Sequence, residues 1–301
     1  MSKEITTQAT NKVTIIGKLL DTSFGNGTLS DGRKYERANL TIRTTQTYEG
    51  REETSEIPVS VFATQYTAAN KPNPAWDTIQ KLRTMKTAQN AGLDDADVVR
   101  INGASLRENN FVSRNGQLIT GWQINTSFVS TGKANDLASF NFDIFIMDMH
   151  DETNREGDTT GRLIIKGGIV QYGGRLDVVE FVVQDPAKVE YLARNWNIDD
   201  TVNVRGRIRV TSQEDTHSAE HSSWGEDIPE VSTQMVRELI ITTGSDTGFD
   251  EEFAYNKDDI RKAFNVRKAE IEQMQIQAKN GSAAKPKAQP TATTSSKYSW
   301  E

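Results

Sequence analysis

A seven-residue stretch that occurs twice constrains the fold of this chain more than any other feature of its sequence. Residues 97–103 (Asp-Val-Val-Arg-Ile-Asn-Gly) are echoed by residues 200–206 (Asp-Thr-Val-Asn-Val-Arg-Gly). In each copy an acidic residue opens a run with apolar side chains at alternate positions, and the run ends on glycine. Such alternation predicts a half-buried β-strand, and the glycine permits a tight bend or a close approach of two backbones.

The segments upstream of the two stretches also match each other. Asn73-Pro74 and Asp185-Pro186 each place a capping residue before a proline, which is typical of the first turn of a helix. Two matches in the same order indicate two copies of one small β-rich domain, each with a single helix before its fourth strand. The length of 301 residues allows two domains that each bury a core.

Alternating apolar residues predict the other strands of both copies. In the first copy they fall in residues 11–19, 38–43, 56–62 and 118–128, with turn clusters at 25–27 and 30–32. In the second copy they fall in residues 140–146, 162–170, 176–183 and 236–243. Three strands, a helix and two strands is the order of an OB-fold barrel, a small closed Greek key.

We therefore expect an all-β protein with minor α content, made of tandem OB-fold Greek-key barrels followed by a C-terminal helix and a disordered tail. The expected divisions are a flexible arm (1–10), a first barrel (11–134), a second barrel (135–245), an acidic segment with a helix (246–279) and the tail (280–301).

The first copy resembles the single-stranded DNA-binding proteins of bacteria and phages. Residues 13–19 are similar to their opening strand, residues 56–62 to their third strand and residues 99–103 to their fourth. The resemblance covers about residues 11–132, with one departure at Ile57, where that family often carries a stacking aromatic. It implies a protein that coats and protects single-stranded DNA in replication or recombination, without sequence preference.

A non-specific binder of single strands needs aromatic platforms between cations. Tyr48 lies between two arginines at the expected tip of the second and third strands, and Phe111 does so at the tip of the fourth and fifth. The resemblance implies that these hairpins project from the barrel and grip the strand. Trp122 shares the parity of Ile124, so we favour a core position for its ring over a platform. The candidate nucleic-acid-binding residues are Arg43, Tyr48, Arg51, Arg107, Phe111, Arg114 and Trp122.

These residues also have ordinary explanations. Tyrosine is common on exposed strands, and arginines beside it can be solvated surface charges. The formal net charge of −7 argues superficially against a nucleic-acid partner. Up to residue 135, however, 16 basic residues outnumber 13 acidic ones, whereas 19 basic residues face 29 acidic ones beyond it. Because phosphate binding depends on local charge, the first copy is the better candidate.

The second copy carries an acidic segment, residues 211–234, where we expect a loop that repels phosphate. Arg205, Arg207 and Arg209 lie on the strand before it, where contact with a nucleic-acid backbone, dimerisation and a spacing role are open alternatives. His217 and His221 in the same segment are a weak signal for a metal, and a solvated loop is favoured.

The C-terminal region predicts one more helix. Asn256 can cap it, two aspartates suit its first turn, and an apolar stripe of Ile260, Phe264, Ile271 and Met274 can pack on a barrel. The low-complexity tail ends in Tyr298 and Trp300, for which a docking peptide and an end without function are open alternatives. The resemblance implies replication or recombination proteins as the partners of such a tail.

Several function classes find no support in the sequence. The chain has no cysteine, no phosphate-cradling GxxxxGK[ST] loop and no catalytic constellation, so we expect neither an enzyme nor a cofactor or metal. No apolar run is long enough to span a bilayer and the N-terminus lacks a signal peptide, so we expect a cytoplasmic protein without membrane contact, in the host cytoplasm if a phage encodes it. The alternative function is a structural or adaptor protein, in a virion or a replication scaffold, whose barrels contact proteins. RNA as the ligand and a homo-oligomer stay open.

Overall fold

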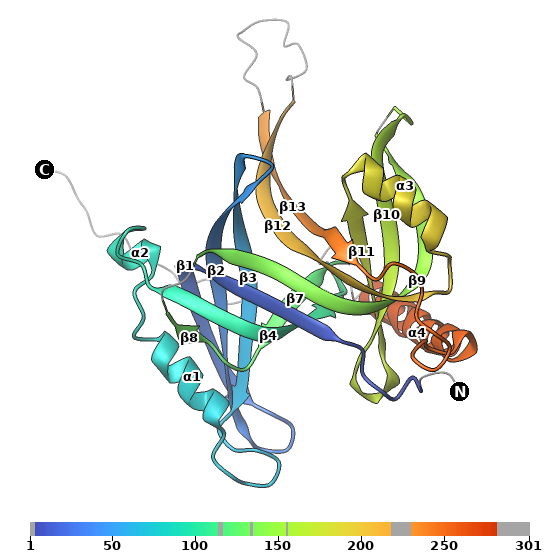
Figure 1. The fold of residues 1–301 in the computed structure, drawn as a ribbon. Helices are drawn as coiled ribbons and strands as arrows, with labels where there is room; N and C mark the ends of the chain where they lie inside the picture. The colour runs from blue at the N-terminus through green and yellow to red at the C-terminus, as the bar shows by residue number, and fades with distance from the viewer. Residues whose placement is uncertain (1–3, 114–116, 133–134, 155, 218–229, 282–301) are drawn as a thin grey trace, which may run out of the picture.

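Each copy of the repeated stretch forms the fourth strand of its own five-stranded β-barrel (Figure 1). The computed structural model describes residues 4–113, 117–132, 135–154, 156–217 and 230–281. The first barrel consists of β1 (Asn11–Thr28), β2 (Lys34–Tyr48), β3 (Arg51–Thr64), α1 (Pro74–Leu82), α2 (Ala88–Ala91), β4 (Val98–Glu108) and β7 (Trp122–Thr126), with the short strands β5 (Phe111–Val112), β6 (Leu118–Ile119) and β8 (Ser130–Thr131).

The second barrel repeats this order of elements. It consists of β9 (Leu137–Thr153), β10 (Thr159–Val170), the 3-10 turn η1 (Tyr172–Gly174), β11 (Leu176–Val183), α3 (Pro186–Asn195), β12 (Thr201–His217) and β13 (Glu230–Gly244), and α4 (Lys257–Gly281) follows it. Both barrels close alike, because the first strand pairs antiparallel with the fourth and the third pairs parallel with the fifth. The predicted tandem OB-fold architecture is confirmed.

The two barrels share a continuous sheet through their first strands. β1 and β9 pair antiparallel from Asn11 opposite Phe142 to Ile16 opposite Leu137. This pairing joins the strands of both barrels, except the separate pair β5 and β6, into one 11-stranded sheet. Figure 1 shows the barrels side by side, with α1 against the first and α3 against the second.

Both predicted helix starts are confirmed. The Asn73 side-chain oxygen accepts a hydrogen bond from the Ala75 amide at 3.1 Å, and the Asp185 carboxylate accepts one from the Ala187 amide at 3.0 Å. Each cap satisfies an amide that the helix itself leaves without a partner. The inner faces of the helices are apolar, with Ile79 of α1 fully buried against the first barrel.

The glycines that end the repeated stretch serve two different purposes. Gly103 has a φ of 71° and lies opposite a register shift between Val13 and Thr14 of β1, so it bends the strand. Gly206 has an ordinary φ, but a Cβ there would lie 1.9 Å from the Ile240 carbonyl oxygen. One glycine therefore allows a bend and the other allows a close approach of backbones.

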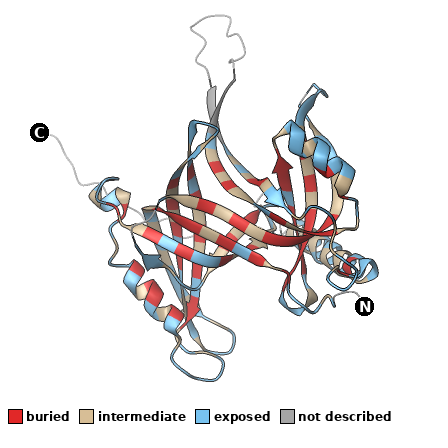
Figure 2. Ribbon diagram, viewed as in Figure 1, coloured by how far each residue is buried: buried red, intermediate tan, exposed pale blue. Residues whose placement is uncertain are grey.

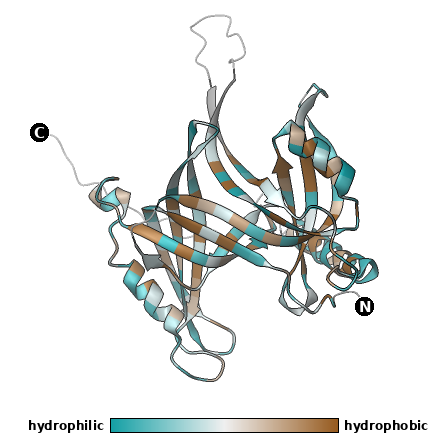
Figure 3. Ribbon diagram, viewed as in Figure 1, coloured by the Kyte–Doolittle hydropathy of each residue, from teal (hydrophilic) through white to brown (hydrophobic). Residues whose placement is uncertain are grey.

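The core follows the alternation of the strands. Figure 2 shows buried positions in bands along both barrels, and Figure 3 shows that these bands are hydrophobic. In β3, for example, Ile57, Val59 and Val61 are at most 2% exposed, while their neighbours are not buried. Such burial of alternate apolar side chains is the main stabilising contribution to each barrel.

Two local expectations differ from the structure. The expected turn at residues 25–27 lies inside β1, because Gly27 provides room for the Tyr35 ring, whose oxygen would be 2.6 Å from a Cβ there. The described parts of the expected loop 211–234 are paired strands, since β12 and β13 continue to His217 opposite Glu230. Residues 218–229 within it, including His221, lie outside the described residues.

The ends of the described chain are held to the second barrel. In the expected flexible arm, the Ala9 amide donates to the Val170 carbonyl at 2.9 Å, and Ile5 packs against the core. The C-terminal helix begins after Asn256, whose side chain accepts from the Asp258 amide at 2.9 Å, and Ile260 is 1% exposed. The predicted packing of this helix on its own chain is therefore confirmed. Among the described residues, no helix is long and apolar enough to cross a membrane.

Candidate nucleic-acid interface

The outer face of strands β2 and β3 follows from the alternation that builds the core. Because Ala38, Leu40 and Ile42 of β2 are buried, the odd-numbered residues of this strand point outward. The buried Val59 and Val61 of β3 leave the even-numbered residues outside in the same way. We call the outward residues Tyr35, Arg37, Asn39, Ser60 and Phe62 the β2–β3 face.

Two aromatic rings of this face contact each other. The ring centroids of Tyr35 and Phe62 lie 5.4 Å apart with an interplanar angle of 32°. Phe62 is 45% exposed, although burial of a phenylalanine side chain would stabilise the fold. Beside them, Gly25 of β1 has no side chain and nothing lies within 4 Å of where its Cβ would be, so the surface next to the rings is open.

The other residues of the β2–β3 face are polar and lie next to the two rings along the strands. Arg37 lies opposite Phe62 in the strand pairing, is exposed, and makes no ion pair with any residue in the described part of the chain. The Ser60 hydroxyl donates to the Asn39 side-chain oxygen, and the Asn39 amide donates to Ser23 of β1, both at 3.4 Å. An aromatic pair with a free guanidinium and amide or hydroxyl groups can stack flat rings and bind an anionic backbone.

The predicted platform Tyr48 lies in a different environment from the one expected. The hairpin of β2 and β3 reaches across to the second barrel, where the Arg207 guanidinium lies 4.1 Å from the centroid of the Tyr48 ring. Partial burial there raises the pKa of the Tyr48 hydroxyl. One face of the ring is thus occupied by a cation–π contact between the barrels.

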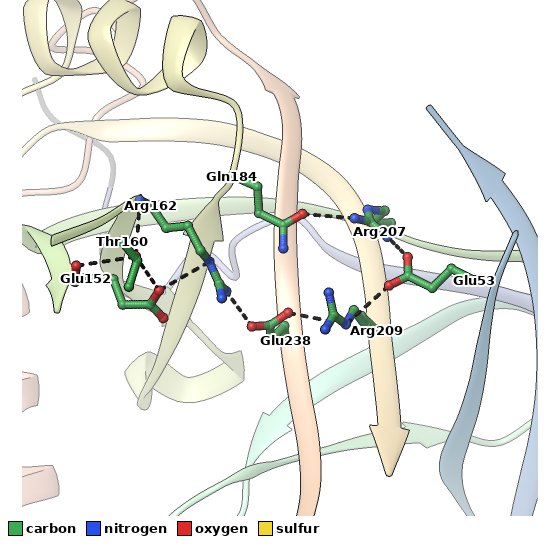
Figure 4. Close-up of polar contacts among 8 residues, drawn as sticks. All are labelled: Glu53, Glu152, Thr160, Arg162, Gln184, Arg207, Arg209 and Glu238. Atoms are coloured by element: carbon green, nitrogen blue, oxygen red, sulfur yellow. Dashed lines mark hydrogen bonds and ion pairs between the residues drawn. The ribbon is translucent and has the colours of Figure 1, made fainter. Parts of the chain in front are cut away.

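Arg207 also belongs to a network of ion pairs (Figure 4). Glu53 of β3 pairs with Arg207 and, at 3.2 Å, with Arg209, both on β12. Glu238 of β13 pairs with Arg209 at 3.6 Å and with Arg162 of β10. The network continues from Arg162 to Glu152 at 3.4 Å and from Arg207 to Gln184 at 3.0 Å.

The network gives Arg207 and Arg209 of β12 a structural role between the two barrels. Three arginines face three glutamates, so the charges balance and the side chains hold the hairpin of the first barrel against the second. Of the three arginines on this strand for which contact with nucleic acid was an alternative, Arg207 and Arg209 are therefore engaged within the protein. Arg205 is exposed, and its Nε donates to Asn203 at 3.1 Å.

The structure separates the other predicted residues. Arg43 pairs with Glu56 at 2.6 Å and Arg107 with the buried Asp177 at 3.9 Å, so neither is a free cation. Trp122 is 7% exposed, which agrees with the core interpretation. Phe111 is 47% exposed on β5, and Arg51 is exposed on β3, so both stay predictions. Arg114, Tyr298 and Trp300 lie outside the described residues.

The residues of the β2–β3 face were missed by the sequence reasoning, which looked for aromatics at hairpin tips. A signal was present. Phe62 is out of phase with the apolar residues Val59 and Val61, and Tyr35 and Arg37 are out of phase with Ala38 and Leu40. A large aromatic at the outward parity of a strand is the pattern that indicates this face.

Comparison with known proteins identifies one matching family model and several solved structures of low similarity. No curated protein matches the sequence. The single-stranded DNA-binding protein from Thermus aquaticus is 14% identical, with 82% of this chain and 98% of that chain covered and a TM-score of 0.48. A deletion mutant of it is 13% identical at the same TM-score, with 82% and 97% covered.

A replication protein A heterotrimer bound to single-stranded DNA covers 90% of this chain and 73% of the other, at 8% identity and a TM-score of 0.22. At these scores the similarities carry no argument about the site, which depends on the residues of this chain. The family model YorF matches residues 9–277, and the chain therefore belongs to the YorF family.

Proposed function

We propose that this protein binds single-stranded DNA without sequence preference, through the β2–β3 face of its first barrel. The observation that carries the proposal is the contact between the half-buried ring of Tyr35 and the exposed ring of Phe62 on that face. OB-folds bind oligonucleotides with the face of their second and third strands, and the rings lie on those two strands.

The chemistry of the face supports a single strand over a duplex. Unpaired bases offer open π-faces, and each base stacked on an aromatic side chain contributes roughly 1–3 kcal/mol. Arg37 is placed beside the rings to contact a phosphate, while Asn39 and Ser60 offer donors and acceptors to sugars or base edges. Stacking is tolerant of sequence because every base has a π-face. The role we propose is therefore to coat and protect exposed strands in replication or recombination, without catalysis.

The test is a fluorescence anisotropy titration of labelled oligo-dT with the full chain. Replacement of both rings by Tyr35→Ala and Phe62→Ala removes two stacking platforms, so we expect the Kd to rise at least about tenfold. Arg37→Gln should lower the slope of log K against log salt by about 0.7, the value for one phosphate contact on a single strand.

A matched control replaces one exposed tyrosine and one exposed phenylalanine elsewhere. Tyr172 and Phe253 are 81% and 57% exposed and lie outside the face, so Tyr172→Ala with Phe253→Ala should leave the Kd unchanged. Phe111→Ala, measured alongside, tests the platform expected at the β5 tip. Equal affinities for the face variant and the control, or no binding of oligo-dT by the unaltered chain, would refute the proposed function and leave the adaptor role.

A further inference from the structure

A hollow of about 440 Å³ lies where the two barrels meet helix α4. Its walls come from β7 of the first barrel, from β10, β11 and β13 of the second, and from α4. The side chains that matter for its chemistry are Trp122, Lys166, Glu180, Arg237 and Arg267, with Met235 at one side. No residue of the β2–β3 face belongs to it.

Arg237 is the cation of this hollow that lies against an aromatic ring. Its guanidinium lies 5.7 Å from the centroid of the Trp122 ring, and its Nη1 donates to the Trp122 carbonyl at 3.3 Å. It makes no ion pair with any residue the structure describes, and partial burial lowers its pKa without an opposing carboxylate. Its Nε donates to the Met235 sulfur at 3.4 Å. Arginine stays charged under such conditions, and because the residue is exposed, its other N–H donors are accessible to an anion.

The other charges leave the hollow with a positive balance. Arg267 is neutralised by Glu108, to which it donates through Nε at 2.6 Å. Lys166 of β10 adds a second cation, and Glu180 of β11 adds one carboxylate. Among the described residues that line the hollow, three cations and two carboxylates leave one net positive charge in a protein whose formal charge is −7, which favours an anionic ligand at this place.

Met235, which lines this hollow, also lies beside the outward side of β3. Thr54 and Glu56 share the outward parity of Phe62 and line a second hollow of about 310 Å³. Met235, which is 55% exposed, borders both hollows. From Phe62 to Thr54 the strand spans about 26 Å at 3.3 Å per residue. A ligand that follows β3 away from the aromatic pair is thus led past Met235 to Arg237.

We propose that this hollow, here called the junction hollow, binds a phosphodiester segment of the same single strand that the β2–β3 face holds. The second barrel then contributes to the site through Arg237 and Lys166, which receive phosphate. The plane of the Arg237 guanidinium, held in place by Trp122, offers a surface on which a base stacks. This inference rests on the proposed function, and it gives the ligand a direction across the two barrels.

The experiment compares two double variants of the full chain in titrations with oligo-dT of about 5 and about 20 nucleotides. The first length is near the lower end and the second is above the upper end of the roughly 4–16 nucleotides that one OB-fold binds. Arg237→Gln with Lys166→Gln removes both cations of the junction hollow. Arg194→Gln with Lys188→Gln removes the same charges from helix α3, where both side chains are at least 46% exposed.

For the long oligonucleotide we expect the junction variant to raise the Kd about tenfold. We also expect it to lower the salt slope by about 1.4, which corresponds to two phosphate contacts. The short oligonucleotide is held by the face alone and should bind with an unchanged Kd. The control variant should match the unaltered chain at both lengths, and urea unfolding should show that both variants are folded.

The outcomes separate this inference from the proposed function. If the junction variant behaves like the control with the long oligonucleotide while Tyr35→Ala with Phe62→Ala weakens binding, the junction hollow is refuted and the face stands. If the junction variant weakens both lengths equally, the proposed direction is wrong. If the unaltered chain binds neither oligonucleotide, both proposals fall.

Discussion

Glu53 should contribute more to stability than any other carboxylate of the β2–β3 hairpin. Its side chain is 22% exposed and faces Arg207, which is 13% exposed, and Arg209. Breaking a buried pair by removing one partner costs about 3–5 kcal/mol, while an exposed pair contributes about 0–1 kcal/mol. With burial between these limits, we expect Glu53→Gln to lower the free energy of unfolding by about 2–3 kcal/mol.

The measurement is urea unfolding of the full chain, followed by tryptophan fluorescence. Glu52→Gln is the matched control, because the neighbouring glutamate makes the same chemical change on the same hairpin but is exposed and has no ion pair with a described residue. The control should shift stability by less than about 0.5 kcal/mol, as surface substitutions do. A cycle with Arg207→Gln should show a coupling energy of about 1–3 kcal/mol. Equal stabilities for Glu53→Gln and Glu52→Gln would refute the view that this network fastens the barrels together.

Two further substitutions test other parts of the fold. Gly206→Ala should lower the free energy of unfolding by more than about 3 kcal/mol, because its Cβ meets the Ile240 carbonyl at 1.9 Å. Gly103→Ala, in open space at a φ of 71°, should lower it by about 1–2 kcal/mol. Similar urea midpoints for the two variants would contradict this assignment of roles. Burial raises the pKa of Asp177, so its ionisation opposes folding, and the stability it contributes at low pH is lost as pH rises through that raised pKa. Asp177→Asn should therefore raise the urea midpoint at pH 7 and lose this advantage below about pH 4, and a constant difference across that range would overturn the assignment.

The architecture could be predicted because it depends on local patterns. The alternation in residues 56–62 predicts a strand whatever lies around it, and Asn73 before Pro74 predicts a helix start for reasons contained in one turn. The repeat supplied the long-range information, since two copies with the same order of elements favour the same fold twice.

The site was less predictable because it depends on which surfaces meet. Tyr48 was placed correctly at a hairpin tip, but the sequence does not show that this tip reaches Arg207 on a strand more than 150 residues later. The pairing of Arg107 with Asp177 has the same origin. Contacts between the barrels therefore engage charges that a strand-by-strand prediction counts as free.

The pairing of β1 with β9 limits how this protein can be divided. The first strand of each barrel pairs with backbone groups at the edge of the other barrel. Separating the halves would therefore not produce two independent modules. A fragment that ends before β9 would present to solvent those amides and carbonyls of residues 11–16 that bond to β9, and such an unpaired strand edge promotes self-association. Because both barrels belong to one chain, β1 and β9 are always present in equal numbers and close together. Two separate halves would have to associate in solution to form the same strand pairing.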